Sequence, residues 1–401
     1  MKRLLCLLLC IAMLPLVPAT AFAASVDLVS DKFSNGLAVI KQNGKYGYLD
    51  TTGTIAIQPQ WDDAQPFSEG FAVIKSNEKY GYINKSGETI SEAMWDSAHS
   101  FSEGRAAVEK NGRWGFINAT GTVVIAPQWS YVKDFSDGAA LVQDRVTSLY
   151  GFIDAQGNIL GEIKWENAQP HSHGLAAVEY GNLWGFVNAK GEVVVQPQYV
   201  KVEDFIDDQT WAITEDIKGN KKFHAINTQG KTLFSASYDE VGHFSEGYAV
   251  VEKGDDRYII NKNGKKVFNA VLIDKFIPYG SSYISQSQDV YTTDYFQNGL
   301  ISVTQFFWQG RSYTKTEGLC NTKGTLVLDC VWKRVYPFSD GLARVETESS
   351  SGKPLFGYVN KTGTLVIKEQ YDKAGDFSDG YAIVWKGSTW YIINKTGKVV
   401  F

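Results

Sequence analysis

The sequence has little cysteine and no long apolar run beyond its first residues. Four cysteines occur among 401 residues, and two of them, Cys6 and Cys10, lie in an N-terminal apolar segment. Cys320 and Cys330 are left, and one disulfide at most is too few for a disulfide scaffold, so packed side chains must stabilise the fold. No later stretch is apolar enough to predict a transmembrane helix.

Basic residues and catalytic motifs are also scarce. The chain has 39 Lys and Arg against 44 Asp and Glu, whereas a nucleic-acid-binding protein needs a basic face. The sequence contains no G-x-S-x-G, H-E-x-x-H, Walker or G-x-G-x-x-G element. We therefore expect no nucleic acid partner, no enzyme activity, no catalytic residues and no cofactor.

Residues 1–23 have the features of a secretory signal peptide. Lys2 and Arg3 precede an apolar run from Leu4 to Val17, and Ala21-Phe22-Ala23 matches the A-x-A cleavage pattern. We expect cleavage near Ala23 and a mature chain of residues 24–401 that is secreted or associated with the cell envelope.

The remaining chain is a tandem repeat rich in glycine and aromatic residues, as is typical of β-structure with tight turns. Each unit has an FSEG-like turn, a strand such as Gly36–Ile40, a second such as Lys79–Ile83 and a third such as Thr54–Ile57, all with period two. This pattern predicts an all-β fold of about ten three-stranded β-meander repeats. The units begin at Phe33, Phe67, Phe101, Phe135, His171, Phe205, Phe244, Phe296, Phe338 and Phe377.

The first strand of each unit carries an alanine followed two residues later by a β-branched residue. Ala38 and Ile40 show the pattern, and Ala212 and Thr214 are its instance in the sixth unit. Because such positions share one face of a strand, we expect that face to be buried. Arg105 and Arg344 lie on the alternate face, which we expect to contact water.

The second and third strands are joined by Asn or Asp, two variable residues and Gly, as in Asp50–Gly53. An Asx side chain bonds its own backbone and glycine accepts positive φ, so we expect a type I turn with a glycine bulge rather than a calcium loop. After the third strand, an aromatic residue, then Ala or Val, then the next Phe follow at spacings of three, as in Trp61, Ala64 and Phe67. We interpret this as a bent connection that carries aromatic anchors into the next unit.

A single unit is expected to be unstable. Burying its apolar side chains contributes roughly 6 to 12 kcal/mol, whereas ordering each residue costs about 1 to 2 kcal/mol. Stability must therefore arise between units. Ten units favour an open solenoid or superhelix over closed propeller-like rings, which usually have about 4 to 8 blades. Residues 27–33 resemble the end of a unit, so an N-terminal strand that completes the last unit and closes a ring is the alternative.

The second strands resemble the WG-containing (KWG-type) β-rich repeat. The aromatic-glycine pairs are Tyr46-Gly47, Tyr80-Gly81, Trp114-Gly115, Tyr150-Gly151, Trp184-Gly185 and Phe356-Gly357. The resemblance covers about residues 26 to 401 and weakens at 205–266 and 271–295. It implies tandem β-repeats in bacterial, often exported, proteins, and it supplies no catalytic residues.

Histidine and cysteine offer few ligands. His171 and His173 stand in an FSEG-like turn, where a solvated turn is favoured over a metal site because further ligands at suitable spacing are lacking. Cys320 and Cys330 flank the turn Asn321–Gly324 at unequal distances, which leaves open whether they form a disulfide or remain two packed thiols.

Two classes of function remain. The first is a binding or scaffold module for a protein or a cell-wall glycan, with Phe71, Trp211, Tyr248 and Tyr381 as possible ligand contacts, unless they cover a neighbouring unit. The second is an enzyme or enzyme inhibitor whose active segment is the insertion at about 270–295 or the loop at 306–315.

Overall fold

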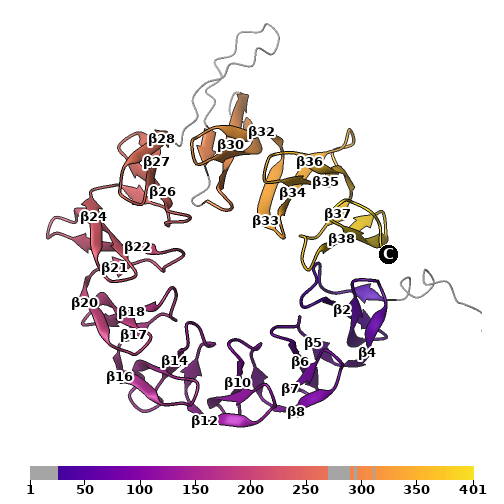
Figure 1. The fold of residues 1–401 in the computed structure, drawn as a ribbon, viewed down its shortest axis with the longest axis horizontal. Helices are drawn as coiled ribbons and strands as arrows, with labels where there is room; N and C mark the ends of the chain where they lie inside the picture. Colours follow the sequence, from indigo (N-terminus) through magenta and orange to yellow (C-terminus); the bar gives the residue numbers. More distant parts are fainter. Residues whose placement is uncertain (1–25, 270–289, 293–295, 310–311) are drawn as a thin grey trace, which may run out of the picture.

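A computed structural model describes residues 26–269, 290–292, 296–309 and 312–401. These residues form ten antiparallel sheets, which we call blades 1 to 10, and the blades follow one another around a ring (Figure 1). The all-β expectation is confirmed. The favoured open solenoid is wrong, and the propeller-like ring is the arrangement observed. In these ranges no helix has the length and apolarity needed to cross a membrane.

Within a blade the strands run in chain order from the inner to the outer side of the ring (Figure 1). The strands are β1 (Asp27–Leu28), β2 (Leu37–Gln42), β3 (Lys45–Asp50) and β4 (Ile55–Trp61) in blade 1; β5 (Asp63–Ala64), β6 (Phe71–Ser76), β7 (Lys79–Asn84) and β8 (Thr89–Trp95) in blade 2; β9 (Ser97–Ala98), β10 (Arg105–Glu109), β11 (Trp114–Asn118) and β12 (Val123–Trp129) in blade 3; β13 (Tyr131–Val132), β14 (Ala140–Gln143), β15 (Tyr150–Ile153) and β16 (Ile159–Trp165) in blade 4; β17 (Asn167–Ala168), β18 (Leu175–Tyr180), β19 (Leu183–Asn188) and β20 (Val193–Tyr199) in blade 5.

The second half continues with β21 (Lys201–Val202), β22 (Gln209–Glu215), β23 (Lys221–Asn227) and β24 (Thr232–Ala236) in blade 6; β25 (Glu240–Val241), β26 (Tyr248–Lys253), β27 (Asp256–Asn261) and β28 (Lys266–Asn269) in blade 7; β29 (Val290–Thr292), β30 (Leu300–Gln309), β31 (Ser312–Asn321) and β32 (Leu326–Trp332) in blade 8; β33 (Arg334–Ser339), β34 (Leu342–Glu348), β35 (Pro354–Asn360) and β36 (Leu365–Tyr371) in blade 9; β37 (Lys373–Ala374), β38 (Tyr381–Lys386) and β39 (Thr389–Asn394) in blade 10.

The blades have a short inner strand that the three-stranded expectation missed. The segment between the outer aromatic residue and the next Phe pairs with the following strand, as Ala64 does with Ile74 and Ala98 with Val108. Most blades are therefore four-stranded, and in blade 10 the bridge between Ile393 and Val399 takes the place of an outer strand.

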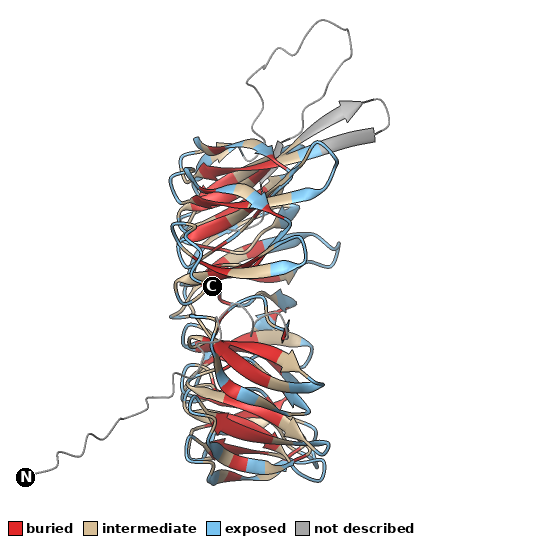
Figure 2. Ribbon diagram, turned by 90° about the vertical axis from the view of Figure 1, so that its right-hand side faces the viewer, coloured by how far each residue is buried: buried red, intermediate tan, exposed pale blue. Residues whose placement is uncertain are grey.

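Both faces of each blade are buried, because each blade is packed between two others (Figure 2). Ala38, Val39 and Ile40 are all 2% exposed or less. The expectation that Arg105 and Arg344 contact water holds only in part, because both residues are partly buried. The Arg105 side chain donates to the carbonyl of Ala155, and the Arg344 side chain is only 15% exposed.

The register of blade 6 corrects one further assignment. Trp211 pairs with Ala225 and Ala212 with His224, as Val39 pairs with Tyr48 and Ile40 with Gly47 in blade 1. Ala212 thus occupies the position of the β-branched residue, not of the alanine. Trp211 and Ala225 exchange large and small side chains relative to blade 1, which conserves the volume between the blades.

The glycine of the aromatic-glycine pair allows a β-bulge in the outer strand. A Cβ atom at Gly47 would lie 2.6 Å from the carbonyl oxygen of Ile57, and the pairing of β3 with β4 shifts register across this glycine. His224 and Tyr258 replace the glycine in blades 6 and 7, and there the strands pair residue by residue across that position. Glycine is needed here for close approach of two backbones, not for positive φ.

The Asx-x-x-Gly turn has the expected geometry in all ten blades. In the first, Asp50 Oδ1 accepts the N–H groups of Thr52 and Thr54, and Gly53 has a φ of 81°. The equivalent Asx residues accept the same two N–H groups. The prediction is confirmed, and these side-chain oxygens serve the turns.

Side-chain packing joins the last blade to the first. Phe33, Ile40 and Leu49 of blade 1 form one apolar cluster with Ile383 and Ile392 of blade 10. Contrary to the expectation for a ring, the N-terminal strand β1 pairs with β2 and completes the first blade rather than the last. Closure thus depends on side chains and single hydrogen bonds, without an exchanged strand.

Candidate functional site

The FSEG-like turns join neighbouring blades. Nine of these turns are closed by a hairpin bridge, and in seven the serine donates a hydrogen bond to the carbonyl oxygen of the first residue of the next unit, as Ser68 does to Phe101 at 2.8 Å. The acidic or Asn residue accepts the N–H of the next turn's glycine, as Glu103 does from Gly138 at 2.9 Å. Eight junctions have this second bond, including the bond from Gly36 to Asp379 that joins blade 1 to blade 10.

The acids of these turns are held in an unfavourable conformation. Glu69 and Glu103 have φ of 51°, in the left-handed region that costs a non-glycine residue about 1 to 2 kcal/mol. The two oxygens of Glu69 accept the N–H groups of Glu103 and Gly104, both at 2.8 Å. A hydrogen bond to a charged group stabilises by about 1.5 to 3 kcal/mol before solvent screening, so these bonds offset the strain. The recurring acids therefore have a structural role.

The four predicted contact residues all pack against the first aromatic residue of the next blade. Phe71 lies 4.5 Å from Phe101 between ring centroids, and Tyr248 lies 5.1 Å from Phe296. Tyr381 lies 6.3 Å from Phe33 across the last junction. These three rings remain partly exposed, so their role as ligand contacts stays a prediction.

Trp211 is different. It is 0% exposed, lies 4.7 Å from Phe244 and donates its indole N–H to the carbonyl of Gly242, so it presents no surface to a ligand. The expected solvated turn at His171 and His173 is wrong for His171, which is 2% exposed. Its ring packs on Phe152, and burial lowers the pKa of its imidazole. The described residues contain no group of three or more His, Cys, Asp or Glu placed to hold a metal ion.

Cys320 and Cys330 are free thiols in one apolar cluster of blades 7 and 8. Burial raises the pKa of Cys320 to about 12 and that of Cys330 to about 11. Both therefore stay protonated near neutral pH and act as packed apolar groups.

The outer strands carry an exposed aliphatic belt that sequence analysis missed. Two or three residues after the turn glycine, each of eight consecutive blades exposes at least one aliphatic side chain by 37% to 52%. We call these residues the outer belt: Val123, Ile159, Val194, Leu233, Val267, Leu326, Leu365 and Val399. They lie on or next to the outermost strands of the ring (Figure 1). Their recurrence at two adjacent repeat positions was the available sequence signal.

The segments considered for the alternative function are mostly outside the description. Of the insertion at 270–295 only residues 290–292 are described, as backbone, and residues 310–311 of the loop at 306–315 lie outside the described residues. The structure thus provides no site geometry for them.

The chain belongs to the family of the WG containing repeat. The profile of that family matches residues 31–46, 46–80, 80–114, 114–145, 150–184, 184–215, 225–258, 318–349 and 356–390. The resemblance of the aromatic-glycine pairs is thereby confirmed. A comparison with curated proteins finds no match.

Two solved structures that match this chain share little sequence with it. A eukaryotic initiation factor has 11% identity and a TM-score of 0.47, and the match covers 83% of this chain and 96% of the other. A chain described as the extracellular domain of a hybrid two component system from B. thetaiotaomicron has 14% identity and a TM-score of 0.23, with 92% and 55% covered. At these scores neither match carries a functional argument.

Proposed function

We propose that this protein is a non-catalytic binding scaffold that is secreted or held at the cell envelope, and that it binds a protein partner through the outer belt. The observation that carries the proposal is the recurrence of an exposed aliphatic residue at one of two adjacent positions in eight consecutive blades. Aliphatic side chains suit an apolar protein surface, whereas sugar rings are recognised chiefly by aromatic and polar groups. Because the outer belt runs over several blades, a partner can contact more than one blade at once, which raises avidity.

The polar groups that recur in the ring support a structural rather than a catalytic use. The Asx side chains bind their own turns, and the acids of the FSEG-like turns bind the next blade. Secretion is supported by the signal-peptide features of residues 1–23. The alternative, an enzyme or inhibitor acting through residues 271–295, predicts that deleting this segment abolishes an activity while binding persists.

A retention experiment tests the proposal. The mature protein is passed over an immobilised envelope-protein fraction and, separately, over purified cell wall, and the bound fraction is measured. We expect retention on the protein fraction, and its loss in a triple variant with Ile159→Lys, Leu233→Lys and Leu365→Lys.

A double variant with Val146→Lys and Ile217→Lys is the matched control. These side chains are 90% and 103% exposed and lie in hairpin turns outside the outer belt. Equal retention of the belt and control variants would contradict the proposal, as would failure of the wild type to bind the protein fraction.

A further inference from the structure

The junction between blades 8 and 9 departs from the repeat on one face. In blades 1 to 5 a cross-strand pair of an aliphatic residue and Tyr or Phe faces the next blade, as Val39 and Tyr48 do. The same pair in blade 8 is Ser302 opposite Leu319. Blade 6 compensates for Ala225 with Trp211, whereas the blade 8 pair contains no aromatic residue.

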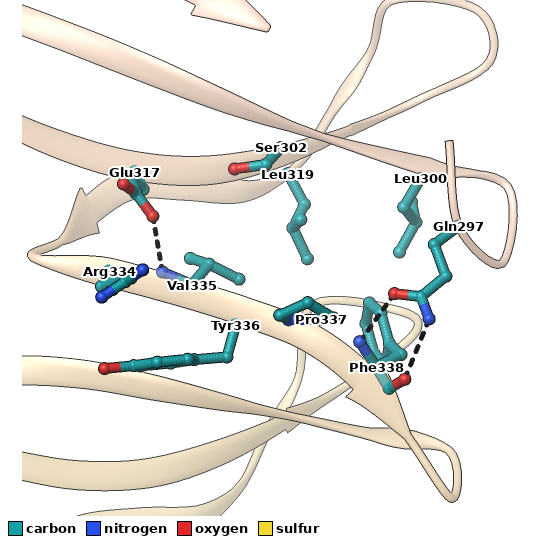
Figure 3. A pocket seen from close by; sticks show the side chains of 10 residues that line it. All are labelled: Gln297, Leu300, Ser302, Glu317, Leu319, Arg334, Val335, Tyr336, Pro337 and Phe338. Carbon is teal, nitrogen blue, oxygen red and sulfur yellow. Dashed lines mark hydrogen bonds between the residues drawn. The ribbon is translucent and has the colours of Figure 1, made fainter. Parts of the chain in front are cut away.

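A third substitution affects the same face. Glu317 pairs with Trp332 in blade 8, where Tyr46 pairs with Trp61 in blade 1. Ser302, Leu319 and Glu317 together line a cavity of about 230 Å³ between blade 8 and strand β33 of blade 9 (Figure 3). The cavity thus arises where three consensus side chains are replaced by smaller or polar ones.

The two ends of the cavity differ in polarity (Figure 3). Leu300 and Phe338 lie at one end beside Gln297, whose amide is hydrogen-bonded to the Phe338 backbone; Leu319 lies between the ends, and Glu317 and Arg334 lie at the other end. Glu317 is 9% exposed, and its carboxylate accepts the backbone N–H of Val335 at 2.8 Å and lies 3.3 Å from the ammonium of Lys315. A buried carboxylate that keeps free lone pairs can accept further hydrogen bonds from a ligand.

The charges favour a neutral ligand. A cation would meet Arg334, and an anion would meet Glu317, each at an electrostatic cost in a partly buried site. A polyhydroxylated ring can donate hydrogen bonds from its hydroxyl groups to Glu317, accept hydrogen bonds from Arg334, and place its C–H face on Phe338 and Leu319. One water occupies about 30 Å³, so the cavity holds one small ring and lies below the roughly 300 to 1,000 Å³ of drug-sized sites.

We propose that this cavity binds one neutral saccharide unit. The proposal rests on the proposed binding function and adds a ligand class to it. The site would give the scaffold a carbohydrate contact on one defined junction, independent of the outer belt.

Ligand-observed NMR and calorimetry test the proposal on the mature protein. The probes are methyl β-glucoside, methyl β-galactoside and N-acetylglucosamine as neutral sugars, with glucosamine and glucuronic acid as charged ones. We expect saturable binding of at least one neutral sugar. Leu319→Tyr, which restores the repeat consensus and fills the cavity, should abolish binding, and Glu317→Gln should weaken it about tenfold or more through the lost charged acceptor.

Phe152→Tyr is the matched control, because it makes the same residue at the same repeat position in blade 4. It should bind as the wild type does. Thermal unfolding identifies any variant that fails to fold, and Ser302→Val then fills the cavity in place of Leu319→Tyr. Three outcomes would overturn the proposal. They are binding that survives either cavity-filling change, a preference for a charged sugar, and the lack of saturable binding of any neutral sugar. The Leu319→Tyr variant keeps the outer belt unchanged, so its retention on the envelope-protein fraction is also measured. Retention without sugar binding by the wild type would refute the saccharide site and leave the proposed scaffold function standing.

Discussion

Replacing Gly185 by alanine should destabilise blade 5 far more than one methyl group suggests. Its Cβ would lie 2.3 Å from the carbonyl oxygen of Val195 and 2.7 Å from the nitrogen of Pro197. Both neighbours are backbone atoms, so no side-chain rotation relieves the overlap, and β20 must move by about 1 Å to reach ordinary contact. Overpacking costs about 1 to 3 kcal/mol, and displaced Val195 and Tyr199 also lose burial. We expect the free energy of unfolding to fall by about 3 kcal/mol.

His224→Ala is the matched control, because His224 stands at the glycine position of a blade without the bulge. Its ring hydrogen-bonds the hydroxyls of Thr214 and Ser235, both at 2.9 Å, and losing these partly exposed bonds should cost about 1 kcal/mol. Urea unfolding followed by tryptophan fluorescence gives the free energies, and hydrogen exchange of blade 5 amides localises the effect. If Gly185→Ala is no more destabilising than His224→Ala, the close-approach explanation of the aromatic-glycine pair is refuted.

Three further predictions concern single groups. Burial lowers the pKa of His171, so below about pH 6.5 the unfolded chain binds the proton more readily than the folded chain, and stability should fall from pH 7.5 to 5. The variant His171→Phe should reduce this decline, measured as the urea midpoint. An unchanged decline would show that His171 is not its source. Because burial raises the thiol pKa values, iodoacetamide at pH 8 should alkylate Cys320 and Cys330 much more slowly in native than in urea-unfolded protein, as mass spectrometry would show, and rapid native alkylation would contradict their burial. Asp379→Ala removes the bond to Gly36 and should speed amide exchange in blades 1 and 10, whereas Asp137→Ala, which removes the same contact between blades 4 and 5, should leave those blades unchanged.

The features that were predictable from sequence are local ones. The Asx-x-x-Gly turn is made within five residues, since Asp50 bonds the N–H groups of Thr52 and Thr54. Strand periodicity is equally local. The short inner strand was missed because two residues such as Asp63 and Ala64 are too few to show a period.

The remaining features depend on contacts between units. The acid in an FSEG-like turn acts on a glycine about 35 residues away, as Glu69 does on Gly104, so its role is not visible within one unit. The partial burial of Arg344 follows from contact with the next blade, which a single amphipathic strand cannot reveal. The cavity beside Glu317 required the cross-strand register, because Ser302 and Leu319 are paired in space and not in sequence.

Ring closure follows from the apolar faces at the two ends of the array. Repeated head-to-tail contacts give an open filament when the rotation between units does not close, and a ring when it does. An open array of ten units has nine junctions and leaves two apolar end faces that need polar caps. Blades 1 and 10 have no such caps on these faces, since Ile40, Leu49, Ile383 and Ile392 are 1% exposed or less within the shared cluster. Closure thus adds a tenth junction with no additional chain to order, and the end blades use the same kind of apolar face as the internal ones.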